Sequence, residues 1–405
     1  MKNNDKKNIV WNLIGSTFSS FSSLFFLIAV TRINGVNEAG IFNIGFSVAC
    51  LFFTVGCYSG RVFQVTDTNK KTDDSAYFYS KIITALLMLV ISFIYCFAKD
   101  YSMHKSIILI SLTVYKMCEA FADGMYAIIQ KKDELYKVGR SLFVKAIIGI
   151  SLFILTDYLT KSMFAAIMML NLVNILGIFI YDKKNLKLVK FKLNKFNKEK
   201  VFEVFKTGIY SFGFSFLTYY IINASKYAID NNLSSELQTV FGIIAMPASV
   251  LLLFGQFVIH PVLNKLKNTI NVNKKEFNNL TLQMINIILV FGLISLVLAY
   301  YLGIPVLNLL YGVDLTSYRL DLLIIIVGAT IYEIAIILST SLIVMRSTLS
   351  QLIMFIIDSI ITLFISNILV KEYGVFGASV SYLTSVSILL LMYIIVYIYK
   401  LRKYK

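Results

Sequence analysis

The chain has 405 residues, of which 58% are hydrophobic and only 15% are charged, and its mean hydropathy is +0.76. A soluble globular protein of this composition would hold more apolar surface than it could bury, so the composition excludes that class and indicates a polytopic membrane protein. The net charge of +16 is dispersed through short segments between apolar stretches, an arrangement that disfavours nucleic-acid binding.

Stretches of about 20 mostly apolar residues predict twelve membrane-spanning helices, because that length crosses the hydrocarbon core of a bilayer. The expected fold is therefore all-α and integral to the membrane. The predicted spans are 9–30, 38–58, 78–98, 107–129, 141–158, 162–181, 205–225, 239–260, 282–303, 321–344, 351–370 and 375–399.

The lysines and arginines are distributed unevenly between the spans. If the N-terminus lies inside the cell, 28 of the 38 fall in inside segments, 7 fall in outside segments and 3 lie within spans. Because cytoplasmic loops carry such an excess of Lys and Arg, the distribution predicts that both termini are cytoplasmic.

The fourth predicted span is long and apolar, yet it carries Lys116, Glu119 and Asp123. At helical spacing these three residues fall within an arc of about 60° on one face. An ionised side chain in lipid costs about 2.5–3.5 kcal/mol, so the face is expected to meet other helices or water. Two interpretations stay open: a self-neutralising cluster that fixes helix packing, or the polar lining of a substrate or ion path.

Two cations lie at the edges of neighbouring spans. Arg61 follows the second span and is either an ordinary cytoplasmic arginine or part of the path. Lys145 lies one turn into the fifth span, where its side chain either extends to the cytoplasmic surface or meets the acidic residues of the fourth span.

The densest basic run, Asp182 to Lys200, falls between the sixth span and the seventh. Lysines alternate there with apolar residues, which suits a segment lying on an anionic membrane surface. The predicted organisation is a six-helix bundle over 1–181, a basic cytoplasmic linker over 182–204 and a second six-helix bundle over 205–405. Since each half starts inside, an internal repeat would be parallel.

Glu333 and Asp358 lie in the tenth and eleventh spans without a Lys or Arg nearby in the sequence. Carboxylates in such positions are candidate proton or sodium sites, although a hydrogen bond between helices explains them nearly as well.

The motifs of common enzyme classes are absent from the sequence, including the P-loop, HExxH and GxSxG. The four cysteines and two histidines show no metal-ligand spacing, so no metal site is expected. A membrane-bound polymerase or acyltransferase is disfavoured because no predicted outside loop exceeds about 17 residues. The chain is thus predicted not to be an enzyme, which leaves a carrier or flippase.

The sequence resembles the Wzx-like polysaccharide and O-antigen flippases of the multidrug/oligosaccharidyl-lipid/polysaccharide exporter superfamily, over nearly its whole length. Three stretches carry the resemblance: Arg61 to Thr84, Val114 to Ser141 with its E…D…Q positions, and Ala224 to Leu266. The resemblance implies two six-helix bundles around a central cavity, in the bacterial cytoplasmic membrane.

The resemblance also implies a cargo, an undecaprenyl-diphosphate-linked oligosaccharide moved between leaflets by alternating access. A diphosphate needs cationic partners, and Arg61, Lys116 and Lys145 are the candidates. Glu119 and Asp123 would orient the lysine or, with Glu333 and Asp358, couple transport to H⁺ or Na⁺, and no cofactor is expected. Membrane lipid and a polysaccharide polymerase are the further partners. The alternative is a cation-coupled exporter of small drugs on the same fold.

Overall fold

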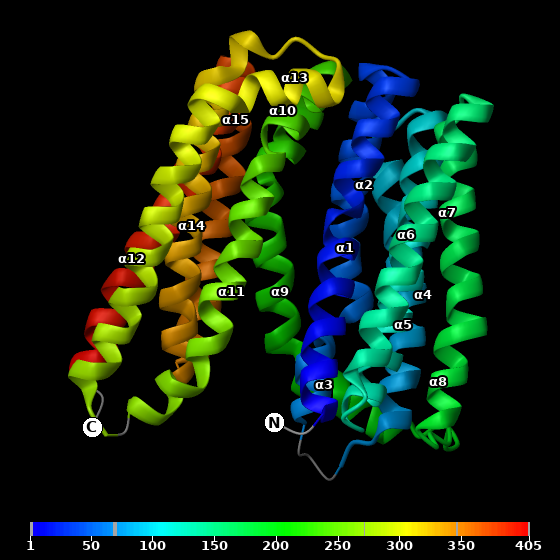
Figure 1. The fold of residues 1–405 in the computed structure, drawn as a ribbon, viewed down its shortest axis with the longest axis vertical. Helices are drawn as coiled ribbons and strands as arrows, with labels where there is room; N and C mark the ends of the chain where they lie inside the picture. Colours follow the sequence, from blue (N-terminus) through cyan, green and yellow to red (C-terminus); the bar gives the residue numbers. More distant parts are fainter. Residues whose placement is uncertain (1–2, 68–70, 271, 346, 404–405) are drawn as a thin grey trace. The chain divides into compact units, whose positions relative to one another are not determined.

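The computed structural model describes residues 3–67, 71–270, 272–345 and 347–403, and every regular element among them is a helix (Figure 1). Nine helical segments in this part of the chain are long and apolar enough to cross a membrane. The prediction of an all-α integral membrane protein is confirmed.

Each predicted span coincides with helix. The first six spans correspond to α1 (Asn3–Ile33), α2 (Val36–Cys57), α4 (Asp74–Ala98), α5 (Met103–Gln130), α6 (Leu135–Thr160) and α7 (Met163–Gly177) with the π-helix η1 (Ile178–Asp182). The other six correspond to α9 (Lys198–Asn232), α10 (Ser235–Ile244) with α11 (Met246–Thr269), α12 (Lys274–Leu298) with the π-helix η2 (Ala299–Gly303), α14 (Arg319–Val344) and the two parts of α15 (Thr348–Lys403). The remaining short elements are α3 (Gly60–Thr66), α8 (Lys183–Leu188), α13 (Ile304–Tyr311) and the 3₁₀-helix η3 (Thr316–Tyr318).

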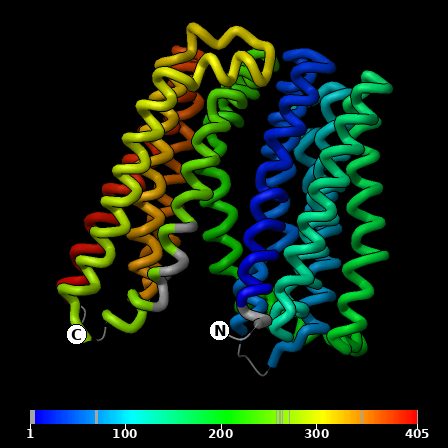
Figure 2. Tube along the Cα trace, viewed as in Figure 1, coloured from blue at the N-terminus to red at the C-terminus, as the bar shows by residue number. Residues whose placement is uncertain are grey.

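Packing divides the chain into two compact units, Met1–Phe216 and Leu217–Lys405, here called unit 1 and unit 2. Each unit is built from consecutive segments, as the colouring along the trace shows (Figure 2). The division falls within α9, and the predicted bundle boundaries at 181/182 and 204/205 remain a prediction.

Helix α5 lies at the centre of unit 1. It packs against α2, α3, α4 and α7, while α1 packs against α6. Most of α5 is therefore buried, whereas outer helices keep apolar side chains on the surface, such as Phe97 of α4, which is 90% exposed. A charged stripe on a central helix meets protein groups, which avoids the cost of exposing charge to lipid.

The segment predicted as a linker is docked onto unit 1. Leu186 of α8 is buried in the apolar cluster around Ile128, Ile129 and Val138. Further along, the backbone N–H of Asn194 donates to Ser75 Oγ over 3.0 Å. The lysines of this segment are mostly exposed, whereas Leu186, Val201 and Val204 are buried.

Unit 2 is built around α14, which packs against α11, α12 and α15. Gly374 divides α15 into its two spans, because its φ of 61° lies in the left-handed region that favours glycine. Buried hydroxyls join the helices: Ser379 Oγ donates to Asp321 Oδ1 over 3.0 Å, and Ser225 Oγ donates to the carbonyl of Ala378 over 2.9 Å.

Candidate functional site

Unit 1 contains a cavity of about 160 Å³ that gathers most of the charged residues singled out in its sequence. Helices α1, α2, α3, α5, α6 and α7 contribute to its wall. The lining residues are Ser19, Ser22, Phe26, Phe53, Arg61, Tyr115, Glu119, Ala122, Asp123, Tyr126, Leu142, Lys145, Ala146, Leu170 and Asn174. Arg61, Glu119, Asp123 and Lys145 thus all face a space inside this bundle.

Arg61 reaches this cavity because the chain breaks between α2 and α3. Tyr58 has φ 47° and Gly60 has φ 76°, so two residues in the left-handed region redirect the backbone just before Arg61. The Nε atom of Arg61 lies 3.8 Å from Asp123 Oδ1, and the two side chains are 26% and 20% exposed. The contact is an ion pair that is longer than a hydrogen bond.

Lys116 lies beside the cavity and not in its wall. Its Nζ atom donates to Glu119 Oε2 over 2.7 Å, one turn along α5. Three aromatic rings surround the ammonium group, with centroids 4.6 Å away for Phe46, 4.8 Å for Tyr115 and 5.8 Å for Phe53. Cation–π contacts and one carboxylate thus hold Lys116, and Glu119, its partner, lines the cavity.

Lys145 meets neither of the two environments that the sequence suggested. It does not extend to the surface and does not contact Glu119 or Asp123; its Nζ atom pairs with the carboxylate of Asp182, which is fully buried. Both expectations are wrong, because the predicted sixth span ends at residue 181 and so leaves Asp182 in the predicted linker. The π-helix Ile178–Asp182 continues α7 and carries this carboxylate into the bundle.

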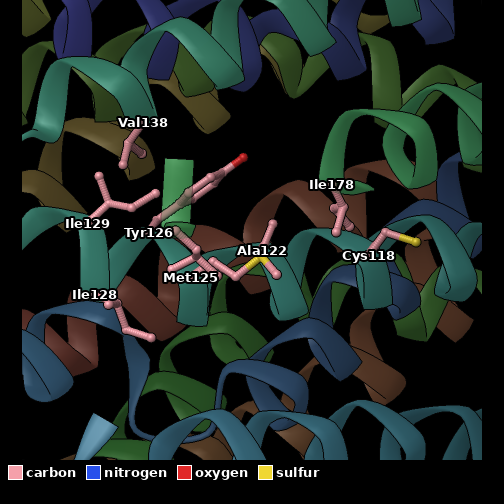
Figure 3. Packing of buried hydrophobic residues seen from close by; sticks show 9 residues of the cluster. Cys118, Ala122, Met125, Tyr126, Ile128, Ile129, Val138 and Ile178 are labelled. Carbon is pink, nitrogen blue, oxygen red and sulfur yellow. The ribbon is translucent and has the colours of Figure 1, made fainter. Parts of the chain in front are cut away.

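The carboxylate of Asp182 is held by two further donors. Ser141 Oγ donates to its Oδ1 atom over 2.6 Å, and the hydroxyl of Tyr126 lies 3.4 Å from Oδ2. The ring of Tyr126 projects from α5 among apolar side chains, with its hydroxyl at the far end (Figure 3). Gly177 makes room for the lysine, because a Cβ there would lie 2.5 Å from Lys145 Cε.

Lys81 is a second residue that the sequence reasoning missed. It is 2% exposed, and its Nζ atom donates to the carbonyl of Cys57 at the end of α2. Beside it, Thr84 Oγ1 donates to the carbonyl of Gly56 over 2.7 Å. Within the described chain no carboxylate lies within 4 Å of Lys81. The available signal was a lysine inside an apolar span with no acidic residue one turn away.

Glu333 and Asp358 belong to unit 2 and are buried there, at 3% and 0% exposure. Among the residues that the structure describes, no donor reaches Glu333 Oε2 or either carboxylate oxygen of Asp358. The expected hydrogen bonds between helices are thus not present for these atoms. Gly255 of α11 accommodates the glutamate, since a Cβ there would lie 1.7 Å from Glu333 Oε2.

The charges around the cavity of unit 1 balance in pairs. Arg61, Lys116 and Lys145 each have one carboxylate partner, namely Asp123, Glu119 and Asp182. An entering anion must therefore compete with these carboxylates. Within the described ranges no group of three His, Cys, Asp or Glu side chains is arranged to hold a metal ion. The chemistry available at this site is exchange of ion pairs.

No protein-family model matches the chain. A curated relative is the capsular polysaccharide biosynthesis protein CapF of Staphylococcus aureus, which is 24% identical over 402 residues. The match covers 97% of this chain and 99% of CapF, so it extends across both units.

Solved structures share the fold. An inward-facing multidrug resistance MATE family transporter of the MOP superfamily superposes with a TM-score of 0.68 at 13% identity, covering 97% of each chain. The lipid II flippase MurJ, in an inward closed conformation, gives a TM-score of 0.68 at 16% identity, covering 98% of this chain and 89% of MurJ. These comparisons confirm the predicted resemblance: the chain has the fold of the multidrug/oligosaccharidyl-lipid/polysaccharide exporter superfamily.

Proposed function

We propose that the chain is a flippase for undecaprenyl-diphosphate-linked oligosaccharide repeat units. It moves them from the inner to the outer leaflet of the bacterial cytoplasmic membrane by alternating access, with both termini in the cytoplasm. The whole-length similarity to a capsular polysaccharide biosynthesis protein and the fold shared with a lipid II flippase support this cargo class. A polysaccharide polymerase is the partner expected to receive the cargo.

The observation that carries the proposal is the loose pair at the cavity wall. Arg61 Nε and Asp123 Oδ1 are 3.8 Å apart, so the guanidinium is close to a carboxylate without donating a hydrogen bond to it. A phosphate group can accept two parallel N–H bonds from a guanidinium, which is stronger than this contact. In the proposed cycle the diphosphate displaces Asp123 from Arg61.

The remaining cations have graded roles in the proposed cycle. Lys145 lines the cavity and supplies a second positive charge there. Lys116 does not line the cavity and acts through its ion pair with Glu119, which does. A carboxylate released by the cargo would be left uncompensated in a site of low dielectric, which favours uptake of H⁺ or Na⁺. Pair exchange therefore offers a route by which substrate binding and ion binding are coupled.

Deletion of the gene tests the cargo. We expect loss of a surface glycan together with accumulation of lipid-linked repeat units on the inner leaflet. Complementation with the wild-type chain restores display, and Arg61→Gln at equal abundance does not. Normal display and no accumulation in the deletion strain would exclude the proposal.

A cation-coupled exporter of small drugs is the second candidate. It is favoured by the buried carboxylates of unit 2, because Glu333 Oε2 and both oxygens of Asp358 lack donors in the described chain and are suited to exchange a cation. The fold shared with a multidrug resistance MATE family transporter also supports this candidate. Drug hypersensitivity of the deletion strain with an intact surface glycan would select this candidate.

A further inference from the structure

Unit 2 has an apolar groove that the transport proposal does not use. Its volume is about 510 Å³, and it lies between the end of α12 with η2 and the start of α14. All of its lining residues belong to unit 2: Leu296, Val297, Tyr300, Tyr301, Leu320, Leu323, Ile324, Val327 and Leu383. Among them Tyr301 is 69% exposed and Val297 is 57% exposed, so the groove is open at the surface of the unit.

The groove coincides with a local change in helix geometry. η2 is a five-residue π-helix, Ala299–Gly303, that directly continues α12. A π-turn widens a helix by one residue, and such turns are frequent at functional sites. Both tyrosines of the groove belong to this turn, and tyrosine combines an apolar ring with a polar end that suits the membrane interface.

Arg319 places a positive charge at the mouth of the groove. It is the first residue of α14, and its guanidinium lies 5.7 Å from the centroid of Tyr300, a lining residue. In the described part of unit 2 no carboxylate lies within 4 Å of it. Asp321, two residues on, is buried and accepts from Ser379 instead. A cation–π contact uses none of the guanidinium N–H donors, so they can bind a phosphate oxygen.

We propose that this groove binds one acyl chain of an anionic phospholipid, with the phosphodiester head group on Arg319. Apolar walls and an aromatic end suit a hydrocarbon chain, and the single guanidinium matches the single negative charge of a phosphodiester. A diphosphate-linked lipid would bring more negative charge than this one cation neutralises. The inference is independent of the cargo of the transporter.

Lipid titrations of the purified full-length protein in detergent, followed by native mass spectrometry, test the proposal. The probes are dioleoyl phosphatidylglycerol, dioleoyl phosphatidylcholine and undecaprenyl phosphate. We expect phosphatidylglycerol to bind about five-fold more tightly than phosphatidylcholine, the effect of one basic side chain near a membrane surface. Arg319→Gln should remove this preference.

A variant that fills the groove distinguishes lipid binding in the groove from lipid binding elsewhere on the apolar surface. Val327→Trp should weaken binding of both phospholipids. Leu363→Trp, at a position on α15 that is 46% exposed and outside the groove, is the matched control and should bind as the wild type does. Equal binding of the two phospholipids to the wild type, or an unchanged preference in Arg319→Gln, would overturn the proposal. Displacement of phosphatidylglycerol by equimolar undecaprenyl phosphate would also overturn it, by assigning the groove to a polyprenyl lipid.

Discussion

Three ion pairs at the cavity of unit 1 differ in how firmly they are held. Lys116 Nζ and Glu119 Oε2 are 2.7 Å apart among aromatic rings, and Lys145 pairs with the fully buried Asp182. Arg61 and its carboxylate partner are 3.8 Å apart and partly exposed to the cavity. Partly exposed pairs contribute about 0–1 kcal/mol to stability, so the Arg61 pair can open with little cost to the fold. This makes it the pair most suited to exchange its partner for a substrate.

Exchanging the charges of Arg61 and Asp123 tests whether Arg61 binds the cargo or only forms an ion pair with Asp123. Arg61→Gln should lower export at least about ten-fold at equal abundance, since one charge-assisted contact to phosphate contributes about 1.5–3 kcal/mol. The double variant Arg61→Asp with Asp123→Arg restores an ion pair but moves the cation to α5, and we expect it to stay inactive. Glycan display per molecule of protein is the measurement.

Lys132→Gln is the control for this series, because Lys132 is an exposed cation outside the cavity. Its export should match the wild type. Recovery of export in the charge-exchanged double variant would show that a local ion pair is all that Arg61 provides.

Replacing Asp182 should lower the free energy of unfolding more than replacing an exposed acidic residue does. Asp182→Asn leaves Lys145, whose side chain is only 11% exposed, without a counter-charge, and breaking a buried pair costs about 3–5 kcal/mol. Adding Lys145→Met removes the uncompensated charge and should recover most of that loss. Thermal unfolding of the purified variants is the measurement.

Asp74→Asn provides the comparison, because Asp74 and Lys131 form a partly exposed pair with side chains 30% and 25% exposed. Its effect should stay within about 1 kcal/mol. If the Asp182→Asn, Lys145→Met double variant were less stable than Asp182→Asn alone, the argument from an uncompensated charge would fail.

At the scale of elements, the junction between α2 and α3 decides where Arg61 points. The last carbonyls of α2 would lack intrahelical donors, and side chains of α4 satisfy two of them: Lys81 bonds to Cys57 and Thr84 bonds to Gly56. A cation at the C-terminal end of a helix is also favoured by the helix dipole. Helix α4 thus fixes the break from which Arg61 enters the cavity.

Loss of the hydrogen bonds that Lys81 and Thr84 donate to the end of α2 should expose Cys57, whose relative accessibility in the intact junction is 8%. In a variant that keeps Cys57 as its single cysteine, Thr84→Val and Lys81→Met should each accelerate labelling by N-ethylmaleimide. Thr54→Val is the matched control, since the Thr54 hydroxyl donates to the carbonyl of Leu51 in its own helix and, among the described residues, to no carbonyl of the junction. Equal labelling rates in all variants would contradict the capping role.

The docked segment 182–204 offers a test that depends on pH. Lys200 Nζ donates to Asp73 Oδ2 over 2.6 Å, next to the start of α4. Burial raises the pKa of the Asp73 carboxyl, but hydrogen bonds from Lys200 and from the backbone N–H of Ala76 outweigh burial, so its pKa lies below the ordinary value. A lowered pKa in the folded state stabilises docking above the ordinary carboxyl pKa, and this contribution is lost as pH falls through the folded-state value.

We therefore expect Lys200→Gln to increase deuterium uptake across 191–204 at neutral pH, whereas Lys198→Gln, at an exposed position, should not. Acidification below the ordinary aspartate pKa of 3.8 should reduce the difference between Lys200→Gln and the wild type. Equal uptake in the two lysine variants at neutral pH would show that the pair does not hold the segment.

The sequence predicted elements better than it predicted partners, for a physical reason. Apolar length along the chain determines which segments can cross a bilayer, so all twelve spans coincide with helix. Helical spacing likewise placed Lys116, Glu119 and Asp123 on one face. The partner of Lys145 could not be found in this way, because Asp182 is 37 residues away and reaches it only through a π-helix at the end of α7.

At the scale of the whole molecule, the charged residues singled out from the sequence are held differently in unit 1 and in unit 2. In unit 1 the three cations implied by the family resemblance each have a carboxylate, whereas in the described part of unit 2 Glu333 and Asp358 are buried with carboxylate oxygens that no donor reaches. Composition and loop charge indicated the membrane class and the resemblance supplied the fold. Neither could reveal this difference, because it depends on which helices pack together.

The central claim is that the cavity of unit 1 binds the diphosphate of a lipid-linked glycan. The most direct measurement is translocation of undecaprenyl-diphosphate-linked oligosaccharide in proteoliposomes, comparing wild type with Arg61→Gln at equal protein content. We predict that the wild type moves the lipid between leaflets and that Arg61→Gln does so at least about ten-fold more slowly. Equal rates for the two proteins, or no translocation by the wild type, would contradict the account.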